Sequence, residues 1–153
     1  MKREEQKETY EREIFLAFIN MTNLDIDRES IKKGNEKNNE PDILCKLSSN
    51  EWVGFELGRL TDSKLRKAIN SWEPVNGEYI RTRDRSADIT KNKLNKKYNT
   101  QFPTELLLYK ENPIITPDNV IIPTIKPMCQ TSHHYYSRIW FMGKSVEILY
   151  ENS

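Results

Sequence analysis

The chain has 153 residues and a formal net charge of +1, with 36% hydrophobic, 31% charged and 10% aromatic residues. This length suits one domain with its own core, and the aromatic content argues against an intrinsically disordered chain. A net charge so close to zero does not by itself indicate a nucleic-acid partner. No apolar run approaches the roughly 20 residues that span a membrane.

The cysteines and the N-terminal stretch bear on the compartment. Cys45 and Cys129 define no disulfide framework. The charged stretch MKREEQKETYERE lacks the apolar region of a secretion signal. We therefore expect a single domain over residues 1–153, in a reducing, cytoplasmic setting and away from membranes.

Residues 3–21 are predicted to form a helix, because they include no Gly or Pro and their apolar residues recur at helical spacing. The expected buried stripe consists of Tyr10, Ile14, Ala17, Phe18 and Met21. Residues 22–40 are polar and rich in Asn, Lys and Glu. We expect a connection there, with a short strand near residues 24–26.

Two apolar segments, residues 42–47 and 52–60, predict a pair of strands joined by a tight turn. A hairpin with its loop at residues 47–51 places Asp42 opposite Glu56. Cross-strand partners have Cβ atoms about 4.5–5.5 Å apart. The sequence therefore predicts two carboxylates held close together on rigid strands.

Glu56 is flanked on its face of the strand by Gly54 and Gly58, which indicates a close approach by another group. Two neighbouring carboxylates stay ionised only if a cation lies between them or one takes up a proton. Mg²⁺ or Mn²⁺ suits oxygen ligands and keeps several waters and a substrate phosphate. Asp42, Glu56 and the backbone carbonyl of Leu57 are the candidate ligands. Such a metal activates water and stabilises charge on a phosphodiester.

The rest of the chain alternates between helical and strand patterns. Helices are predicted at residues 62–72 and 86–98, and a buried strand at 104–111. A loop punctuated by prolines follows, with Pro113, Pro117, Pro123 and Pro127. Two final strands within residues 137–150 meet near Gly143. This order predicts an α/β (α+β) layered domain.

Basic residues concentrate in the region of the second predicted helix, where seven of them accompany two acidic residues. They are Arg81, Arg83, Arg85, Lys91, Lys93, Lys96 and Lys97. Such a segment either follows a phosphate backbone or forms a solvated helix face. The candidate nucleic-acid contacts are Arg81, Arg83, Arg85, Lys93, Lys96 and Lys97.

The segment QTSHHYYSR near the C-terminus holds the two histidines of the chain. Cys129, His133 and His134 lack a fourth ligand, and adjacent loop histidines point in different directions, so a zinc site is disfavoured. The segment instead offers phosphate contacts through Ser132, His133 and Tyr135.

Pro41-Asp42, followed after thirteen residues by Glu56-x-Gly58 and preceded by a Glu-rich helix, resembles the PD-(D/E)xK nuclease superfamily. The resemblance implies a restriction-endonuclease-like mixed central sheet flanked by helices, and Mg²⁺-dependent hydrolysis of nucleic-acid phosphodiester bonds. In that superfamily the two acids bind the metal and a glutamate of the first helix often joins them. Carried over, these are Asp42 and Glu56, with Glu11 preferred over Glu13 for the helix position.

One position departs from the motif, because its lysine would fall where this chain has Gly58. In some members of the superfamily the basic residue lies on a neighbouring helix, and Lys91 and Lys93 are the preferred replacements here. Arg59 is disfavoured, since a regular strand points it away from the face of Glu56. If no residue replaces the lysine, the site is catalytically silent.

Three functions stay open at this point. The first is a metal-dependent nuclease of a phage, mobile element or defence system, with DNA favoured over RNA and with two copies pairing to cut both strands. The second is a catalytically silent nucleic-acid-binding module on the same fold. The third is a protein-interaction module, such as an inhibitor or immunity partner, which would form a stoichiometric complex and bind no nucleic acid.

Overall fold

The computed structural model describes residues 3–61, 85–111 and 116–152. The helices are α1 (Arg3–Asn20), the 3-10 helix η1 (Glu36–Asn38), α3 (Ser86–Leu94) and α4 (Asp118–Thr131). The strands are β1 (Ile26–Lys33), β2 (Ile43–Leu47), β3 (Trp52–Leu60), β4 (Thr104–Lys110), β5 (Arg138–Met142) and β6 (Val146–Glu151). The helix predicted at 62–72 lies outside the described residues, as do Arg81 and Arg83.

The strands form one six-stranded mixed sheet in the order β1-β2-β3-β4-β5-β6. The first three strands are antiparallel neighbours, β3, β4 and β5 run parallel, and β6 returns antiparallel to β5. The predicted strands at 42–47, 52–60 and 104–111 and the final strand pair are confirmed. The mixed α and β character predicted from the sequence is therefore confirmed.

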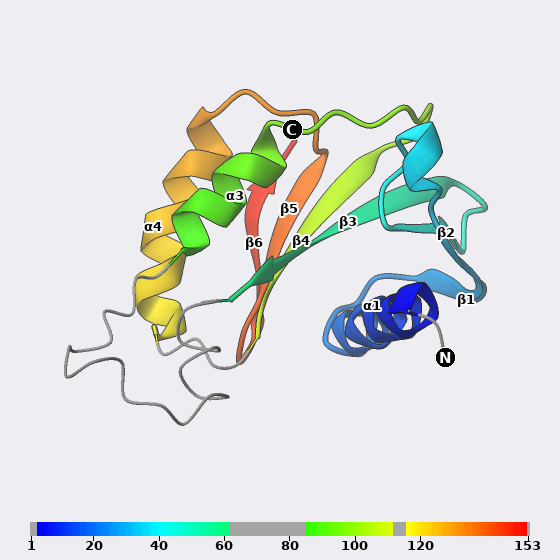
Figure 1. Ribbon diagram of the computed structural model, residues 1–153, viewed down its shortest axis with the longest axis horizontal. Helices are drawn as coiled ribbons and strands as arrows, with labels where there is room; N and C mark the ends of the chain where they lie inside the picture. The colour runs from blue at the N-terminus through cyan, green and yellow to red at the C-terminus, as the bar shows by residue number, and fades with distance from the viewer. Residues whose placement is uncertain (1–2, 62–84, 112–115, 153) are drawn as a thin grey trace.

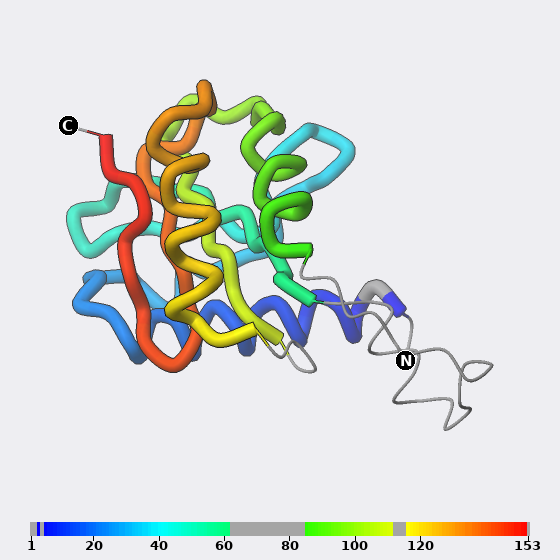
Figure 2. The backbone as a smooth tube through the Cα atoms, turned by 90° about the vertical axis from the view of Figure 1, so that its left-hand side faces the viewer, coloured from blue at the N-terminus to red at the C-terminus, as the bar shows by residue number. Residues whose placement is uncertain are grey.

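Helices cover both faces of the sheet (Figure 1). α1 packs on one face, and α3 and α4 lie side by side on the other (Figure 2). The alternation of β4 divides its side chains between two cores: Leu107 and Tyr109 face α1, whereas Leu106 and Leu108 face α3 and α4. In the described part of the chain, every helix is too short or too polar to cross a bilayer.

The buried face of α1 is rotated from the predicted stripe. Phe15, Phe18 and Ile19 form its centre, whereas Ala17 and Met21 are exposed. The aromatic rings decide this rotation, because Phe15 and Phe18 both pack against Phe55 of β3. Such contacts between distant segments are not visible in the periodicity of one helix.

The prediction for residues 22–40 is only partly correct: the short strand expected near residues 24–26 is the start of the longer edge strand β1, and η1 follows it where a connection was expected. Only Ile26 and Ile31 of β1 are buried, and its other side chains are mostly charged. Because apolar and polar residues do not alternate in β1, the sequence pattern does not predict the full strand there. Charged side chains are common on edge strands, where they oppose pairing with other chains.

The predicted proline loop is wrong over residues 118–131, which form α4. Ile121, Ile125 and Cys129 are fully buried at helical spacing and anchor the helix to the sheet. Pro123 and Pro127 lie four residues apart on its exposed side. The carbonyls that lose their N–H partners therefore face water, and packing outweighs the proline penalty.

α3 is shorter than the predicted helix over 86–98 and ends at Leu94. Tyr98 therefore follows the helix and approaches the sheet from an extended segment. Leu94 is buried as expected, and Ile89 and Tyr98 pack against the same core.

A tight crossing between Gly34 and Pro41 closes the loop that carries η1. The Gly34 N–H donates to the Asp42 carbonyl at 3.0 Å. A Cβ on Gly34 would overlap the Pro41 carbonyl oxygen, which is part of the backbone and cannot rotate away. This crossing fixes the start of β2 and with it the position of Asp42.

Replacing Gly34 with alanine is expected to lower the free energy of unfolding by about 1–3 kcal/mol, as overpacked substitutions do. The matched variant is Gly58→Ala, whose Cβ would meet the end of the Leu108 side chain at 2.6 Å. Because that side chain can rotate, Gly58→Ala should lose clearly less stability. Urea unfolding measures both variants, and equal losses would contradict the backbone constraint at Gly34.

Candidate functional site

A cleft of about 820 Å³ opens where β2 and β3 diverge. The two strands pair as far as Ile43 and Phe55, and β3 then continues to Leu60 beside β4. The pairing of Ile43 with Phe55 puts Asp42 opposite Glu56, so the predicted register is correct. The cleft is lined from α1, the loop with η1, β3 and the segment around α3.

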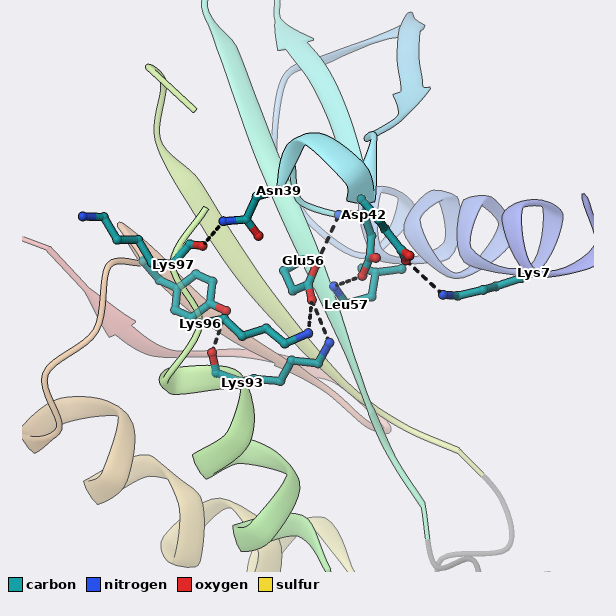
Figure 3. A network of polar contacts seen from close by, with 10 residues as sticks. Lys7, Asn39, Asp42, Glu56, Leu57, Lys93, Lys96 and Lys97 are labelled. Carbon is teal, nitrogen blue, oxygen red and sulfur yellow. Dashed lines mark hydrogen bonds and ion pairs between the residues drawn. The ribbon is translucent and has the colours of Figure 1, made fainter. Parts of the chain in front are cut away.

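Asp42 and Glu56 hold each other in place through the backbone (Figure 3). The Asp42 N–H donates to Glu56 Oε1 at 3.2 Å, and the Leu57 N–H donates to Asp42 Oδ2 at 2.9 Å. Each carboxylate therefore caps the neighbouring strand at the point where regular pairing ends. The two acids predicted from the sequence meet at one point.

The glycines beside Glu56 make room for parts of the protein itself. A Cβ on Gly54 would lie 2.5 Å from Pro41 Cγ, and a Cβ on Gly58 would lie 3.5 Å from Lys93 Cγ. The close approach predicted for this face is thus made by Pro41 at Gly54 and by Leu108 at Gly58, where a Cβ would lie 2.6 Å from Leu108 Cδ2. The Lys93 side chain passes Gly58 at an ordinary van der Waals distance.

Lys93 of α3 reaches Glu56 across the strand. Its Nζ lies 2.7 Å from Glu56 Oε2, and Lys96 Nζ lies 3.5 Å from the same oxygen. Glu56 is 3% exposed, so burial raises its pKa, but the charge and hydrogen bond of Lys93 outweigh burial and hold the pKa below its usual value. Glu56 therefore stays ionised.

The pKa of Asp42 is shifted in the opposite direction from that of Glu56. Burial, followed by repulsion from Glu56 and Glu11, raises its pKa to about 7, although the Leu57 N–H acts against the shift. Burial also raises the pKa of Glu11, with repulsion from Glu56 adding to it and Lys7 opposing it. Three carboxyl groups, from α1, from the residue before β2 and from β3, thus converge, and burial raises the pKa of two of them, Glu11 and Asp42.

The sequence left two candidate acids on α1 and two candidate lysines on α3, and the structure distinguishes between them. Glu11 and Lys93 line the cleft, whereas Glu13 and Lys91 are exposed and lie outside its lining. Arg59 also lines the cleft, where its Nε forms an ion pair with Glu111 Oε2 at 3.2 Å.

The predicted nucleic-acid contacts are only partly at the cleft. Lys93, Lys96 and Lys97 line it, whereas Arg85 is exposed before α3 and is not part of the lining. Arg81 and Arg83 fall outside the described residues.

Sequence reasoning missed the contacts that close the cleft from the side of the η1 loop. Lys7 Nζ lies 3.3 Å from Glu36 Oε1, which joins α1 to this loop. The Asn39 side chain donates to the Lys97 carbonyl at 2.7 Å, which joins the loop to the segment after α3. No pattern marks these residues, because each pair is separated by many residues in the chain.

Tyr98 is a further part of the cleft. Its hydroxyl lies near Glu56 but outside hydrogen-bond geometry, and its proximity helps to lower the Glu56 pKa. Burial raises the pKa of Tyr98, so the phenol keeps its proton.

The disfavoured zinc site gains no support. Cys129 is buried, burial raises its pKa to about 12, and its backbone carbonyl lies 2.9 Å from His134 Nε2. Among the described residues, no group of three or more His, Cys, Asp and Glu side chains has the geometry of a metal site. This also holds for the carboxylates that line the cleft.

Comparisons with protein-family models, with curated proteins and with solved structures find no match for this chain. The resemblance to PD-(D/E)xK nucleases therefore depends on the residues of the cleft alone.

Asp42→Asn is expected to stabilise the protein at pH 8 by about 1–3 kcal/mol. The folded carboxyl keeps its proton up to pH about 7, whereas its usual pKa is 3.8. The free energy of unfolding of the wild type therefore falls as the pH rises between these values. Asparagine imitates the protonated form, so the gain should vanish near pH 4.

Chemical denaturation at both pH values measures this difference. The control is Glu13→Gln on the exposed face of α1, which should change stability little at either pH. A loss of stability at pH 8 in Asp42→Asn would contradict the repulsion among the three acids.

Proposed function

We propose that the cleft hydrolyses phosphodiester bonds of nucleic acid with the help of a divalent cation, as PD-(D/E)xK nucleases do. The observation that carries the proposal is the convergence of Glu11, Asp42, Glu56 and Lys93 at the divergence of β2 and β3. In this proposal, the four residues take the roles that the superfamily motif assigns to a helix acid, two strand acids and a lysine. A mixed sheet between helices is compatible with the restriction-endonuclease-like fold.

The donor set suits Mg²⁺ or Mn²⁺, because it consists of oxygen atoms. The N–H and C=O of one residue in a strand point the same way. The Leu57 carbonyl therefore faces the same edge as its N–H, which binds Asp42. A cation there would relieve the repulsion on Asp42, and Mg²⁺ commonly binds through one or two carboxylates plus waters and phosphate oxygens. Bound there, the cation would supply charge stabilisation and an activated water.

Lys93 takes the place of the motif lysine in this proposal. The Lys93 side chain passes Gly58, where a Cβ would lie 3.5 Å from Lys93 Cγ, and its ammonium group reaches Glu56 Oε2. From this position its ammonium group orients the water or the scissile phosphate, while Lys96 and Lys97 attract the neighbouring phosphates. At the end of the cleft nearest α1, burial raises the pKa values of both Glu11 and Asp42.

Cleavage of plasmid, single-stranded DNA and RNA in Mg²⁺ or Mn²⁺ tests the proposal. Asp42→Ala and Glu56→Ala should abolish detectable cleavage, because each removes a cation ligand. Glu13→Ala is the matched control, since it removes an exposed carboxylate from α1. Wild-type activity in either cleft variant would show that the cleavage belongs to another site or another protein.

Lys93→Ala should lower the cleavage rate by about 10²–10³-fold, the size typical for the loss of one group that stabilises developing charge. Lys91→Ala removes the same charge from the exposed side of α3 and should retain nearly full activity. Single-turnover rates at saturating protein distinguish this loss from weaker binding. Equal effects of the two substitutions would contradict the role of Lys93.

A second candidate function is a catalytically silent nucleic-acid-binding module. The observation in its favour is that Lys93 Nζ, 2.7 Å from Glu56 Oε2, neutralises the carboxylate that would hold the cation. This alternative predicts salt-dependent binding that survives Glu56→Gln, and no cleavage with any divalent cation.

A further inference from the structure

A second, smaller cavity of about 220 Å³ adjoins the cleft and shares Lys97 and Tyr98 with it. Aromatic side chains dominate its lining, with Phe102, Tyr135 and Tyr136 joining Tyr98. Its volume is below the roughly 300–1,000 Å³ of pockets that enclose a whole small ligand. The size and lining suit one flat ring system that enters from a longer molecule.

Tyr135 and Tyr136 are adjacent in the chain but differ in role. Tyr136 is buried, and its hydroxyl donates to the Lys93 carbonyl at 2.8 Å, which fixes the end of α3. Tyr135 is 55% exposed at the cavity. The Tyr135 ring packs edge-on against His133, with their centroids 5.1 Å apart, and its exposed part is open to contact with a ligand in the cavity.

Positive charge stands directly beside this exposed ring. Lys97 Nζ lies 5.1 Å from the centroid of Tyr135, and Lys97 also lines the larger cleft. An aromatic ring next to an ammonium group matches a nucleotide, whose base stacks on the ring while its phosphate pairs with the cation.

We propose that the small cavity binds an unpaired nucleobase of a single-stranded nucleic acid, with the adjacent phosphate in the cleft beside Lys97. The inference rests on the proposed function, because it names the substrate class of the same site. A base within a duplex is stacked and paired, so it cannot enter such a cavity without unpairing. The site therefore selects single-stranded segments over continuous duplex.

The test measures binding without cleavage. Fluorescence anisotropy in EDTA follows three labelled probes of about 12 nucleotides, a length within the usual site sizes: single-stranded DNA, RNA of the same sequence and the DNA duplex. The wild type should bind the single strands more tightly than the duplex. Tyr135→Ala should weaken single-strand binding about tenfold, the loss expected for one stacked base, and change duplex binding less than twofold.

Two matched variants and one matched probe separate stacking from charge and from folding. Tyr135→Phe keeps the ring and should bind like the wild type. Lys126→Ala removes a lysine from α4, away from both cavities, and should leave all affinities unchanged. An abasic strand keeps the phosphates but lacks bases, so wild type and Tyr135→Ala should bind it equally.

Failure of this inference is distinguishable from failure of the proposed function. If Tyr135→Ala leaves the preference between single strand and duplex unchanged, or if no probe binds, the nucleobase site is wrong. Cleavage dependent on Asp42 would still support the nuclease in the first case. If cleavage is absent but Tyr135→Ala still weakens single-strand binding, the nucleobase site is supported as part of a catalytically silent binding module.

Discussion

Repulsion among carboxyl groups at the divergence of β2 and β3 is the constraint on which the site depends. Glu56 is compensated by Lys93, whereas Asp42 receives one backbone N–H and two neighbouring acids. An amide at position 42 would keep the hydrogen bond to Leu57 and remove the repulsion. By keeping an acid at position 42, the protein gives up folding stability. Groups with perturbed pKa values in clefts are typical of functional sites.

The topology explains why this point can gather groups from both faces of the sheet. Elsewhere the sheet separates α1 from α3, because their side chains enter different cores. Beyond Phe55, β2 no longer pairs with β3. Side chains from both faces of the sheet can therefore meet at this open edge of β3. Glu11 reaches this edge from one face of the sheet and Lys93 from the other. Together with the segments that carry Asp42 and Glu56, four parts of the chain can therefore contact one ligand in the cleft.

Local periodicity predicted the parts of the site that lie on strands. The turn length fixes the register of β2 and β3, so the proximity of Asp42 and Glu56 followed from the sequence alone. The helical residues could only be narrowed to pairs, because the rotation of each helix is set by its packing. Glu11, which the sequence favoured over Glu13, lies four residues before buried Phe15, which the predicted stripe omitted.

Most of β1 and all of α4 escaped prediction for the same physical reason. β1 has few apolar residues and is held by backbone pairing to β2, which leaves no periodic signal. α4 contains two prolines, and its buried stripe of Ile121, Ile125 and Cys129 overrides the local cost. In both elements the deciding energy comes from partners distant in the chain, which a single sequence does not reveal.

In the proposed nuclease the basic group lies on a helix and not on the strand, and this difference changes what the site depends on. A lysine at position 58 would be placed by β3 itself, whereas Lys93 is placed by the packing of α3. That packing includes buried Leu94 and the bond from the Tyr136 hydroxyl to the Lys93 carbonyl. Tyr136 also borders the aromatic cavity. The position of the ammonium group beside Glu56 is therefore coupled to the segment that carries Tyr135, and a strand lysine would lack this coupling.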